Sequence, residues 1–268
     1  MVTRESPVGV FDSGIGGLTV AHAVMHQLPH ESVTYFGDTA RVPYGPKSPD
    51  TVRRYSREIA SFLVDQGVKT VVVACNTATA HALPALRESL SMPVIGVIEP
   101  GARAAVQATR NGHVGVIGTA GTIKSGAYER ALRAIEPSLR VTARACPLFV
   151  PLVEEGWVDH EATRLVAAEY LAPLLREDVD TLVLGCTHYP LLKNVIADVL
   201  GSDVRLIDSA EETANETASM LQERCLAANG AAEPRYRFIA SDDPLMFLQL
   251  GQRFLSGAIE SVEVKTLG

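Results

Sequence analysis

The sequence lacks the features that would place it in a secreted, metal-binding or membrane class. Its 4 cysteines include no C-x-x-C pair and have no zinc-ligand spacing with histidine, so we expect reduced thiols and neither disulfides nor a metal site. No apolar run approaches the roughly 20 residues of a membrane helix, and no signal-peptide segment precedes the first predicted strand. The sequence therefore predicts a cytoplasmic protein without a membrane partner.

Concentrated positive charge is also absent. Lys and Arg number 24 against 31 Asp and Glu, which gives a formal net charge of −7. The basic residues form no continuous run, so nucleic acid is not expected as a partner. With 268 residues, of which 47% are hydrophobic, the chain is long enough for one large domain or two of ordinary size.

Two stretches of the chain share one plan, in which an apolar run ends in a small residue that is followed by a cysteine and short polar side chains. The first covers residues 71–77 (VVVACNT) and contains Cys75, and the second covers residues 181–190 (TLVLGCTHYP) and contains Cys186. Each cysteine is predicted to lie between the carboxyl end of a strand and the next helix. Open α/β sheets bind ligands at this edge, where helix N-termini offer unpaired N–H groups.

A second repeat has nearly the same offset. Residues 9–17 (GVFDSGIGG) and residues 115–121 (GVIGTAG) both form a predicted strand that runs into a glycine-rich polar turn. Two repeats in the same order predict two pseudo-symmetric α/β domains with mostly parallel sheets and an active site in the cleft between them. We assign residues 1–97 and 210–268 to a discontinuous first domain and residues 98–209 to the second, with the crossing at residues 98–101.

The hydrophobic pattern predicts the remaining elements. Strands are expected at residues 8–11, 32–36, 68–74, 93–97, 114–117, near 141, before 186, at 204–207 and at 236–240, and helices at 18–27, 51–65, 78–90, 125–135, 161–175, 191–200, 211–227 and 244–252. The first glycine-rich turn reads G-x-G-G, which does not match the dinucleotide-binding spacing G-x-G-x-x-G. Cys146 and Cys225 are expected to be small hydrophobic residues in the packing.

Two thiols on opposite walls of a cleft suit a reaction that removes a proton from one face of a carbon and returns one to the other face. A free cysteine has a pKa of about 8.5, and a helix N-terminus or a nearby cation lowers it. We expect such a helix effect at both Cys75 and Cys186. His188 and Asp12 are the neighbours expected to hold or exchange a proton.

Uncharged donors are the expected ligands of the substrate's carboxylates, because they bind an anion without adding charge to the cleft. These donors are the backbone N–H groups and the side chains of Ser13, Asn76, Thr77, Thr119 and Thr187.

At these residues the sequence resembles the glutamate racemases of the cofactor-independent aspartate/glutamate racemase family. The resemblance covers nearly the whole chain and rests on the motifs at residues 10–17 (VFDSGIGG), 37–38 (GD), 43–45 (PYG), 74–78 (ACNTA) and 184–190 (LGCTHYP). It implies interconversion of L- and D-glutamate without a cofactor, to supply D-glutamate for peptidoglycan. We expect the protein to be a homodimer.

The resemblance also implies roles for individual residues. Cys75 and Cys186 would be the two acid/base thiols, assisted by a glutamate that is either Glu154 or Glu155. The residues expected to contact or assist the substrate are Asp12, Ser13, Pro43, Tyr44, Gly45, Asn76, Thr77, Thr187 and His188.

Other function classes share some of these features. A bilobed amino-acid-binding protein has two halves and a cleft but needs no thiol on each wall. A cysteine hydrolase needs one thiol and a well-placed histidine. Cys186 and His188 are too close in sequence to be taken as such a catalytic pair. Within the family, racemisation of aspartate, or another proton-transfer or decarboxylation reaction, is the main alternative. Lysines that pyridoxal phosphate would require exist at residues 47, 69, 124 and 193, but the thiol pair makes that cofactor unnecessary.

Overall fold

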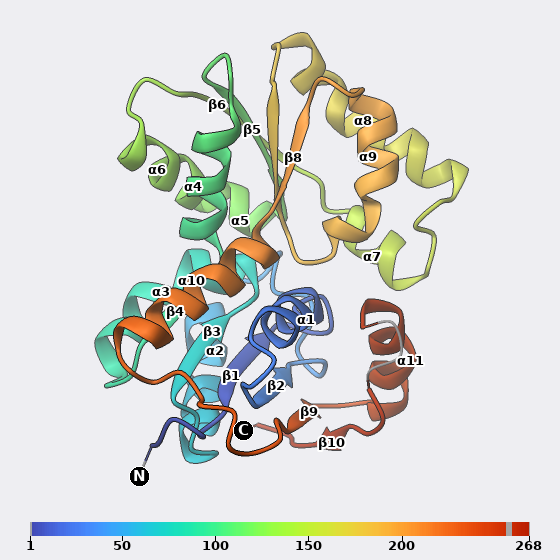
Figure 1. The fold of residues 1–268 in the computed structure, drawn as a ribbon. Helices are drawn as coiled ribbons and strands as arrows, with labels where there is room; N and C mark the ends of the chain where they lie inside the picture. Colours follow the sequence, from blue (N-terminus) through green and yellow to red (C-terminus); the bar gives the residue numbers. More distant parts are fainter. Residues whose placement is uncertain (1, 256–258, 268) are drawn as a thin grey trace.

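The computed structural model describes residues 2–255 and 259–267 of the chain. Two α/β units lie one above the other, and helix α10 (Ser209–Glu223) lies across their junction (Figure 1). Both ends of the chain lie at the lower unit.

The lower unit contains a six-stranded sheet in the order β10-β9-β2-β1-β3-β4, and every printed pair in it is parallel. Its strands are β1 (Val8–Asp12), β2 (Val33–Gly37), β3 (Thr70–Val73), β4 (Val94–Gly96), β9 (Tyr236–Ala240) and β10 (Glu263–Val264). The helices are α1 (Leu18–Gln27), α2 (Pro49–Asp65), α3 (Asn76–Ser89) and α11 (Pro244–Phe254), while α10 packs on α1.

The upper unit contains a four-stranded parallel sheet in the order β6-β5-β7-β8. Its strands are β5 (His113–Gly118), β6 (Arg140–Ala145), β7 (Thr181–Gly185) and β8 (Arg205–Asp208). Its helices are α4 (Ile98–Ala108), α5 (Ala120–Ser125), α6 (Ala127–Ile135), α7 (Phe149–Glu154), α8 (Glu161–Arg176), the 3-10 helix η1 (Tyr189–Leu192) and α9 (Lys193–Leu200).

The two sheets share one strand order, because β2-β1-β3-β4 in the first corresponds to β6-β5-β7-β8 in the second. The glycine-rich turns therefore follow the equivalent strands β1 and β5, and the two cysteines follow the equivalent strands β3 and β7. The strand before the glycine-rich turn and the strand before the cysteine are neighbours in each sheet, β1 beside β3 and β5 beside β7. From β1 the chain adds β2 on one side and then β3 on the other, and from β5 it adds β6 on one side and then β7 on the other. Such a switch point is where open parallel sheets form a crevice at their carboxyl ends. The predicted fold class is confirmed.

The last two strands join the first sheet, since β9 pairs with β2 and β10 pairs with β9. This arrangement agrees with a discontinuous first domain. The domain boundaries at residues 97–98 and 209–210 stay a prediction.

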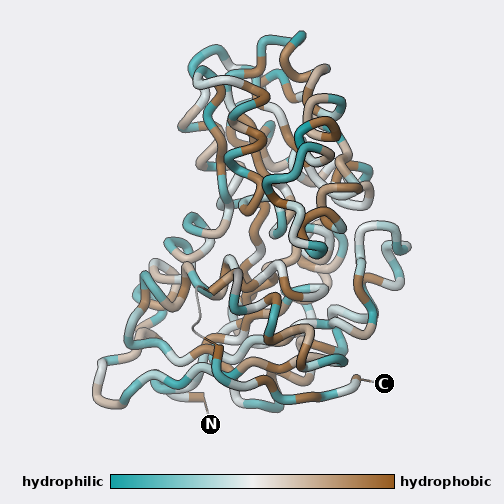
Figure 2. The backbone as a smooth tube through the Cα atoms, turned by 90° about the vertical axis from the view of Figure 1, so that its right-hand side faces the viewer, coloured by the Kyte–Doolittle hydropathy of each residue, from teal (hydrophilic) through white to brown (hydrophobic). Residues whose placement is uncertain are grey.

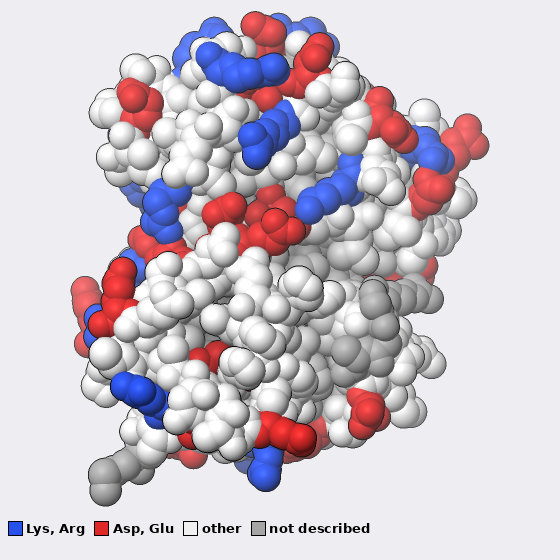
Figure 3. Space-filling view, in the orientation of Figure 1, with Lys and Arg blue, Asp and Glu red and all other residues white. Residues whose placement is uncertain are grey.

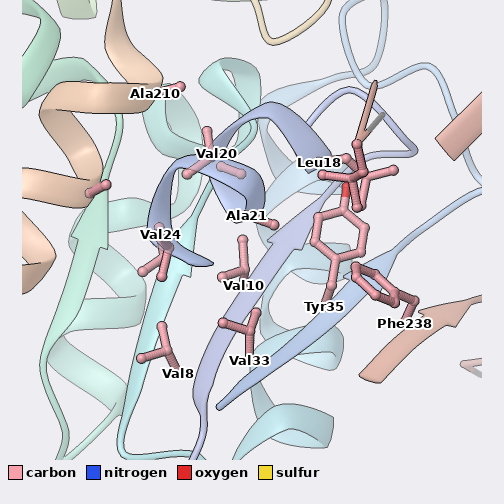
Figure 4. Packing of buried hydrophobic residues seen from close by; sticks show 14 of the residues in the cluster. Val8, Val10, Leu18, Val20, Ala21, Val24, Val33, Tyr35, Ala210 and Phe238 are labelled. Atoms are coloured by element: carbon pink, nitrogen blue, oxygen red, sulfur yellow. The ribbon is translucent and has the colours of Figure 1, made fainter. Parts of the chain in front are cut away.

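Both faces of the first sheet are covered by helices, which explains the nearly continuous apolar sequence of its strands. Val8 and Val10 of β1 pack toward α1, where they meet Ala21 and Val24 (Figure 4). Phe11 belongs to the cluster on the opposite face, as the two-residue period of a strand requires. Hydrophobic segments accordingly run through the interior of both units, and hydrophilic segments lie mostly at the periphery (Figure 2).

Some local predictions differ from the structure. Residues 98–101, where the crossing is predicted, form the first turn of helix α4, because Pro100 falls where a helix needs no N–H donor and so does not break it. The crossing itself stays a prediction. The helix predicted over residues 125–135 corresponds to α6, and Gly126, whose φ is +66°, separates it from α5, which was not predicted. Strand β10 was not predicted, and Cys225 is exposed, unlike the buried Cys146.

Acidic and basic side chains are interspersed over the face drawn in Figure 3, with acidic side chains near the junction of the units. Within residues 2–255 and 259–267, no helix is long and apolar enough to cross a membrane.

Candidate active site

A small cavity lies between the two units, at the carboxyl ends of their central strands. Its volume is about 30 Å³, far below the roughly 300–1,000 Å³ of sites that hold a small-molecule ligand. Its lining residues are Ser13, Val42, Pro43, Tyr44, Gly45, Cys75, Asn76, Thr77, Thr119, Val150, Cys186, Thr187 and His188. Both units therefore contribute side chains, including one cysteine each, and an amino acid would enter only after the units separate.

Cys75 caps the N-terminus of α3, where its sulfur accepts a hydrogen bond from the Ala78 N–H at 3.4 Å. Its Sγ also lies 3.6 Å from Oγ of Ser13. Burial and the nearby Asp12 carboxylate raise the pKa of Cys75 to about 12, although the hydrogen bonds from Ala78 and Ser13 act to lower it. The predicted lowering by the helix N-terminus is thus present but outweighed.

Cys186 lies in a different environment. It is followed by Thr187, His188 and the short helix η1, and its Sγ lies 3.9 Å from Nδ1 of His188. The other ring nitrogen, Nε2, lies 3.1 Å from Oε1 of Glu154 on α7. Burial lowers the pKa of His188, but the hydrogen bonds to Cys186 and Glu154 outweigh it and raise that pKa to about 10. A protonated imidazole, and not a helix N-terminus, is therefore the positive group beside Cys186.

Asp12 ends β1 and is fully buried. Its Oδ2 accepts a hydrogen bond from the Gly14 N–H at 2.9 Å, and its Oδ1 accepts one from Thr187 Oγ1 at 3.5 Å. Burial raises the pKa of Asp12, although His188 and the backbone N–H groups act to lower it. The charge of Asp12 thus acts on both Cys75 and His188.

Gly16 permits this close approach of the two units. A Cβ at this position would collide with Oγ1 of Thr187 and with the His188 ring. The glycine of the first turn is therefore required by the residues that follow β7.

The segment with Pro43, Tyr44 and Gly45 is held by a buried carboxylate. Asp38 accepts hydrogen bonds from the Tyr44 hydroxyl, from Ser241 Oγ at 2.9 Å and from Arg41 Nε at 2.8 Å. Burial raises the pKa of Tyr44, and the charge of Asp38 raises it further. The phenol is therefore a hydrogen-bond donor and fixes the cavity wall.

Hydroxyl groups join the two units on another side of the cavity. Thr77 Oγ1 at the start of α3 lies 2.9 Å from Thr119 Oγ1 and 3.1 Å from Thr122 Oγ1, both at the start of α5. Nearby, the Gly121 N–H donates to the Gly45 carbonyl oxygen at 2.9 Å. A ligand anion could accept hydrogen bonds from these hydroxyls once they release one another.

The structure brings the sequence-predicted residues together. Asp12 and Glu154 do not line the cavity but contact residues that do, namely Thr187 and His188. Glu155 is exposed, so Glu154 is the glutamate beside the histidine. Sequence reasoning missed Thr122 and Tyr128, which contact Thr77 and Asn76 from elements distant in sequence. It also missed the role of Asp38, which contacts Tyr44 six positions further along the chain. Of these, only Asp38 belonged to a quoted motif.

No group of three or more His, Cys, Asp or Glu side chains that could hold a metal ion occurs in the part of the chain that the structure describes. The fold and the site together define a class of α/β enzyme with two parallel-sheet units and a thiol from each unit at one cavity.

Comparison with known proteins identifies the family. The sequence model of the Asp/Glu/Hydantoin racemase family matches residues 18–217, and the chain belongs to this family. A glutamate racemase of Geobacter metallireducens is 56% identical over 95% of this chain and 94% of its own. A glutamate racemase structure from Bacillus anthracis has a TM-score of 0.93 at 45% identity and covers 99% of this chain and 98% of its own. One from Francisella tularensis, in complex with D-glutamate, has a TM-score of 0.92 at 41% identity over 98% of both chains.

Proposed function

We propose that this protein is a glutamate racemase, which interconverts L- and D-glutamate by proton transfer at the α-carbon between Cys75 and Cys186. The observation that carries the proposal is that one cysteine from each unit lines the same cavity, together with donors for carboxylates. No cofactor is required by this chemistry, and no lysine occurs among the described residues that line the cavity. The product D-glutamate would serve peptidoglycan synthesis.

The two thiols have different neighbours, since the His188 ring faces Cys186 and the Asp12 carboxylate acts on Cys75. The imidazolium of His188 stabilises negative charge on Cys186, whereas the raised pKa of Cys75 keeps that sulfur protonated. Cys186 as a thiolate would take the α-proton of one enantiomer, and the Cys75 thiol would give its proton to the opposite face. The reverse reaction needs the opposite protonation states, and Asp12 and His188 lie where they could exchange the necessary protons.

Carboxylate recognition would use uncharged donors. The side-chain amide of Asn76 and the hydroxyls of Ser13, Thr77, Thr119 and Thr187 surround the cavity, and backbone N–H groups at the start of α3 add to them. These groups support an acidic amino acid as the substrate, as in the Francisella tularensis complex with D-glutamate.

The test is to incubate the purified protein separately with L-glutamate and L-aspartate and to follow optical rotation. EDTA and hydroxylamine are present throughout, so that metal- or carbonyl-dependent chemistry is suppressed. We expect the rotation of L-glutamate to decay to zero and that of L-aspartate to persist, with a Cys75→Ser protein as the inactive control. Decay with L-aspartate alone, or activity that requires an added divalent ion, would reassign the function.

The homodimer and the cytoplasmic location stay predictions from the sequence. Sedimentation at several protein concentrations, with and without glutamate, would test the first.

A further inference from the structure

Within the described part of the chain, the side-chain amide of Asn76 is hydrogen-bonded through its oxygen but not through its nitrogen. Its Oδ1 accepts a hydrogen bond from the Tyr128 hydroxyl at 2.6 Å. Its Nδ2 has no hydrogen-bond partner among the residues that the structure describes, although Asn76 is only 2% exposed and lines the cavity. A buried N–H group without a partner is costly. A ligand in the cavity that offers an acceptor oxygen to Nδ2 would remove this cost.

Tyr128 reaches Asn76 from the other unit. It lies on α6 and is only 3% exposed. A Cβ at Gly185, at the end of β7, would lie 2.9 Å from the tyrosine ring, and a Cβ at Gly101 on α4 would lie 3.6 Å from its hydroxyl. The ring is thus packed tightly between elements of the upper unit, and its hydroxyl is directed at α3 of the lower unit.

We propose that Tyr128 is a positioning residue that fixes the amide orientation of Asn76, so that the amide N–H₂ group faces a carboxylate of the substrate. This inference rests on the proposed function, because it requires an acidic amino acid in the cavity. A phenol hydroxyl has one proton to donate. The phenol oxygen could also accept a hydrogen bond, but the Ser209 side chain is hydrogen-bonded to it. Donation of the phenol proton to Oδ1 therefore fixes the amide with its donor side toward the ligand.

The same contact makes Asn76 sensitive to the relative position of the units. Asn76 belongs to the lower unit and Tyr128 to the upper unit, so the amide is fixed only while the two are together. Without the hydroxyl, the amide could rotate by 180° and present Oδ1 to the carboxylate, which repels it. The substrate would then have to restore the productive orientation, and part of its binding energy would be lost.

The experiment compares Tyr128→Phe with the parent protein and with Tyr189→Phe. The Tyr189 hydroxyl is equally buried but donates to the backbone carbonyl of Cys146 at 2.8 Å, so its removal controls for the loss of a buried hydrogen bond. We measure kcat and KM for both glutamate enantiomers, the Kd of D-glutamate by calorimetry, and the melting temperature. For Tyr128→Phe we expect KM and Kd to rise about five- to tenfold while kcat changes less than about twofold.

For Tyr189→Phe we expect a lower melting temperature with unchanged KM. A double variant supplies the second test, since Tyr128→Phe should add little to the KM of Asn76→Ala if the tyrosine acts through the asparagine.

Unchanged KM and Kd in Tyr128→Phe, with an active parent protein, would overturn this inference and leave the proposed function intact. Equal additional losses in the parent and Asn76→Ala backgrounds would also overturn it. A parent protein that binds D-glutamate without racemising it would instead refute the proposed function, and the Kd comparison would still decide the role of Tyr128. Absence of any glutamate binding to the parent would refute both.

Discussion

Nε2 of His188 lies 3.1 Å from Oε1 of Glu154, while the other nitrogen of the same ring faces the sulfur of Cys186. The histidine therefore connects a carboxylate on α7 to one of the two thiols. Both partners favour the charged ring and raise the pKa of His188 to about 10 against the effect of burial.

The first prediction is that this pair makes stability depend on pH. The folded pKa of about 10 exceeds the ordinary value of 6.5. The stabilisation is therefore complete below about pH 6.5 and is lost as the pH rises through about 10. In Glu154→Gln the folded pKa of His188 falls, so we expect a smaller decline of the unfolding free energy across this window. Urea unfolding from pH 6 to pH 10.5 measures it.

The neighbouring Glu155 provides a matched control, because it is exposed and the structure gives it no bond to His188. Glu155→Gln should keep the pH profile of the parent protein. Identical profiles for the parent, Glu154→Gln and Glu155→Gln proteins would show that Glu154 does not hold the charge of His188.

The cysteine strands, the turn after β1 and the parallel fold could be predicted because local sequence determines them. A run of β-branched apolar residues that ends in a small residue and a short polar stretch favours a strand followed by a turn. The pKa of Cys75 could not be predicted in this way, because it depends on burial by the opposite unit and on the Asp12 carboxylate. The contacts of Asp38 and Tyr128 were missed for the same reason, since Ser241 and Asn76 are far away in sequence. Glu154 could not be distinguished from Glu155 from the sequence, because the distinction depends on how α7 is oriented toward His188.

The second prediction concerns Asp12, whose pKa is raised by burial next to both proton-handling groups. Asp12→Asn keeps the shape but removes the exchangeable carboxyl proton, so we expect kcat to fall about 10²-fold or more while KM changes less than about threefold. Steady-state kinetics in both directions measure the two constants. Asp180→Asn is the control, because Asp180 accepts three hydrogen bonds from residues 109–111, away from the cavity. Equal rises in KM with unchanged kcat would make Asp12 a binding residue only.

The third prediction follows from the size of the cavity. Its volume of about 30 Å³ indicates that the two units are closed over the site in this structure. Glutamate bound between the units should stabilise the folded protein by RT ln(1 + [L]/Kd), about 2.7 kcal/mol at a hundredfold excess over Kd. For a chain of this size, that corresponds to a rise in melting temperature of roughly 5–10 °C. Both enantiomers should produce it in thermal melts, and L-lysine should not. A melting temperature that saturating glutamate leaves unchanged would argue against a site between the units.

The fourth prediction concerns the division of labour between the two thiols. If Cys75 and Cys186 act on opposite faces of the α-carbon, each enantiomer is deprotonated by one sulfur, and the product receives its proton from the other. By resemblance to the family, Cys186 should deprotonate L-glutamate and Cys75 should deprotonate D-glutamate. The imidazolium beside Cys186 and the raised pKa of Cys75 suit the first of these directions.

In D₂O the thiol that reprotonates the carbon carries deuterium from the solvent. Product formed in the first turnovers should therefore contain deuterium at the α-carbon, while recovered substrate stays largely unlabelled, in both directions of the reaction. Proton NMR of the separated enantiomers measures this asymmetry. A single base that both removes and returns the proton would instead label substrate and product alike.

Replacing either cysteine by alanine should abolish racemisation, because the remaining thiol can act on one face only. Both sulfurs are buried, so circular dichroism must first show that each variant is folded. A folded Cys75→Ala protein that racemises near the parent rate would refute the paired-thiol mechanism. Early label at equal levels in substrate and product would refute it as well, since one base would then serve both faces.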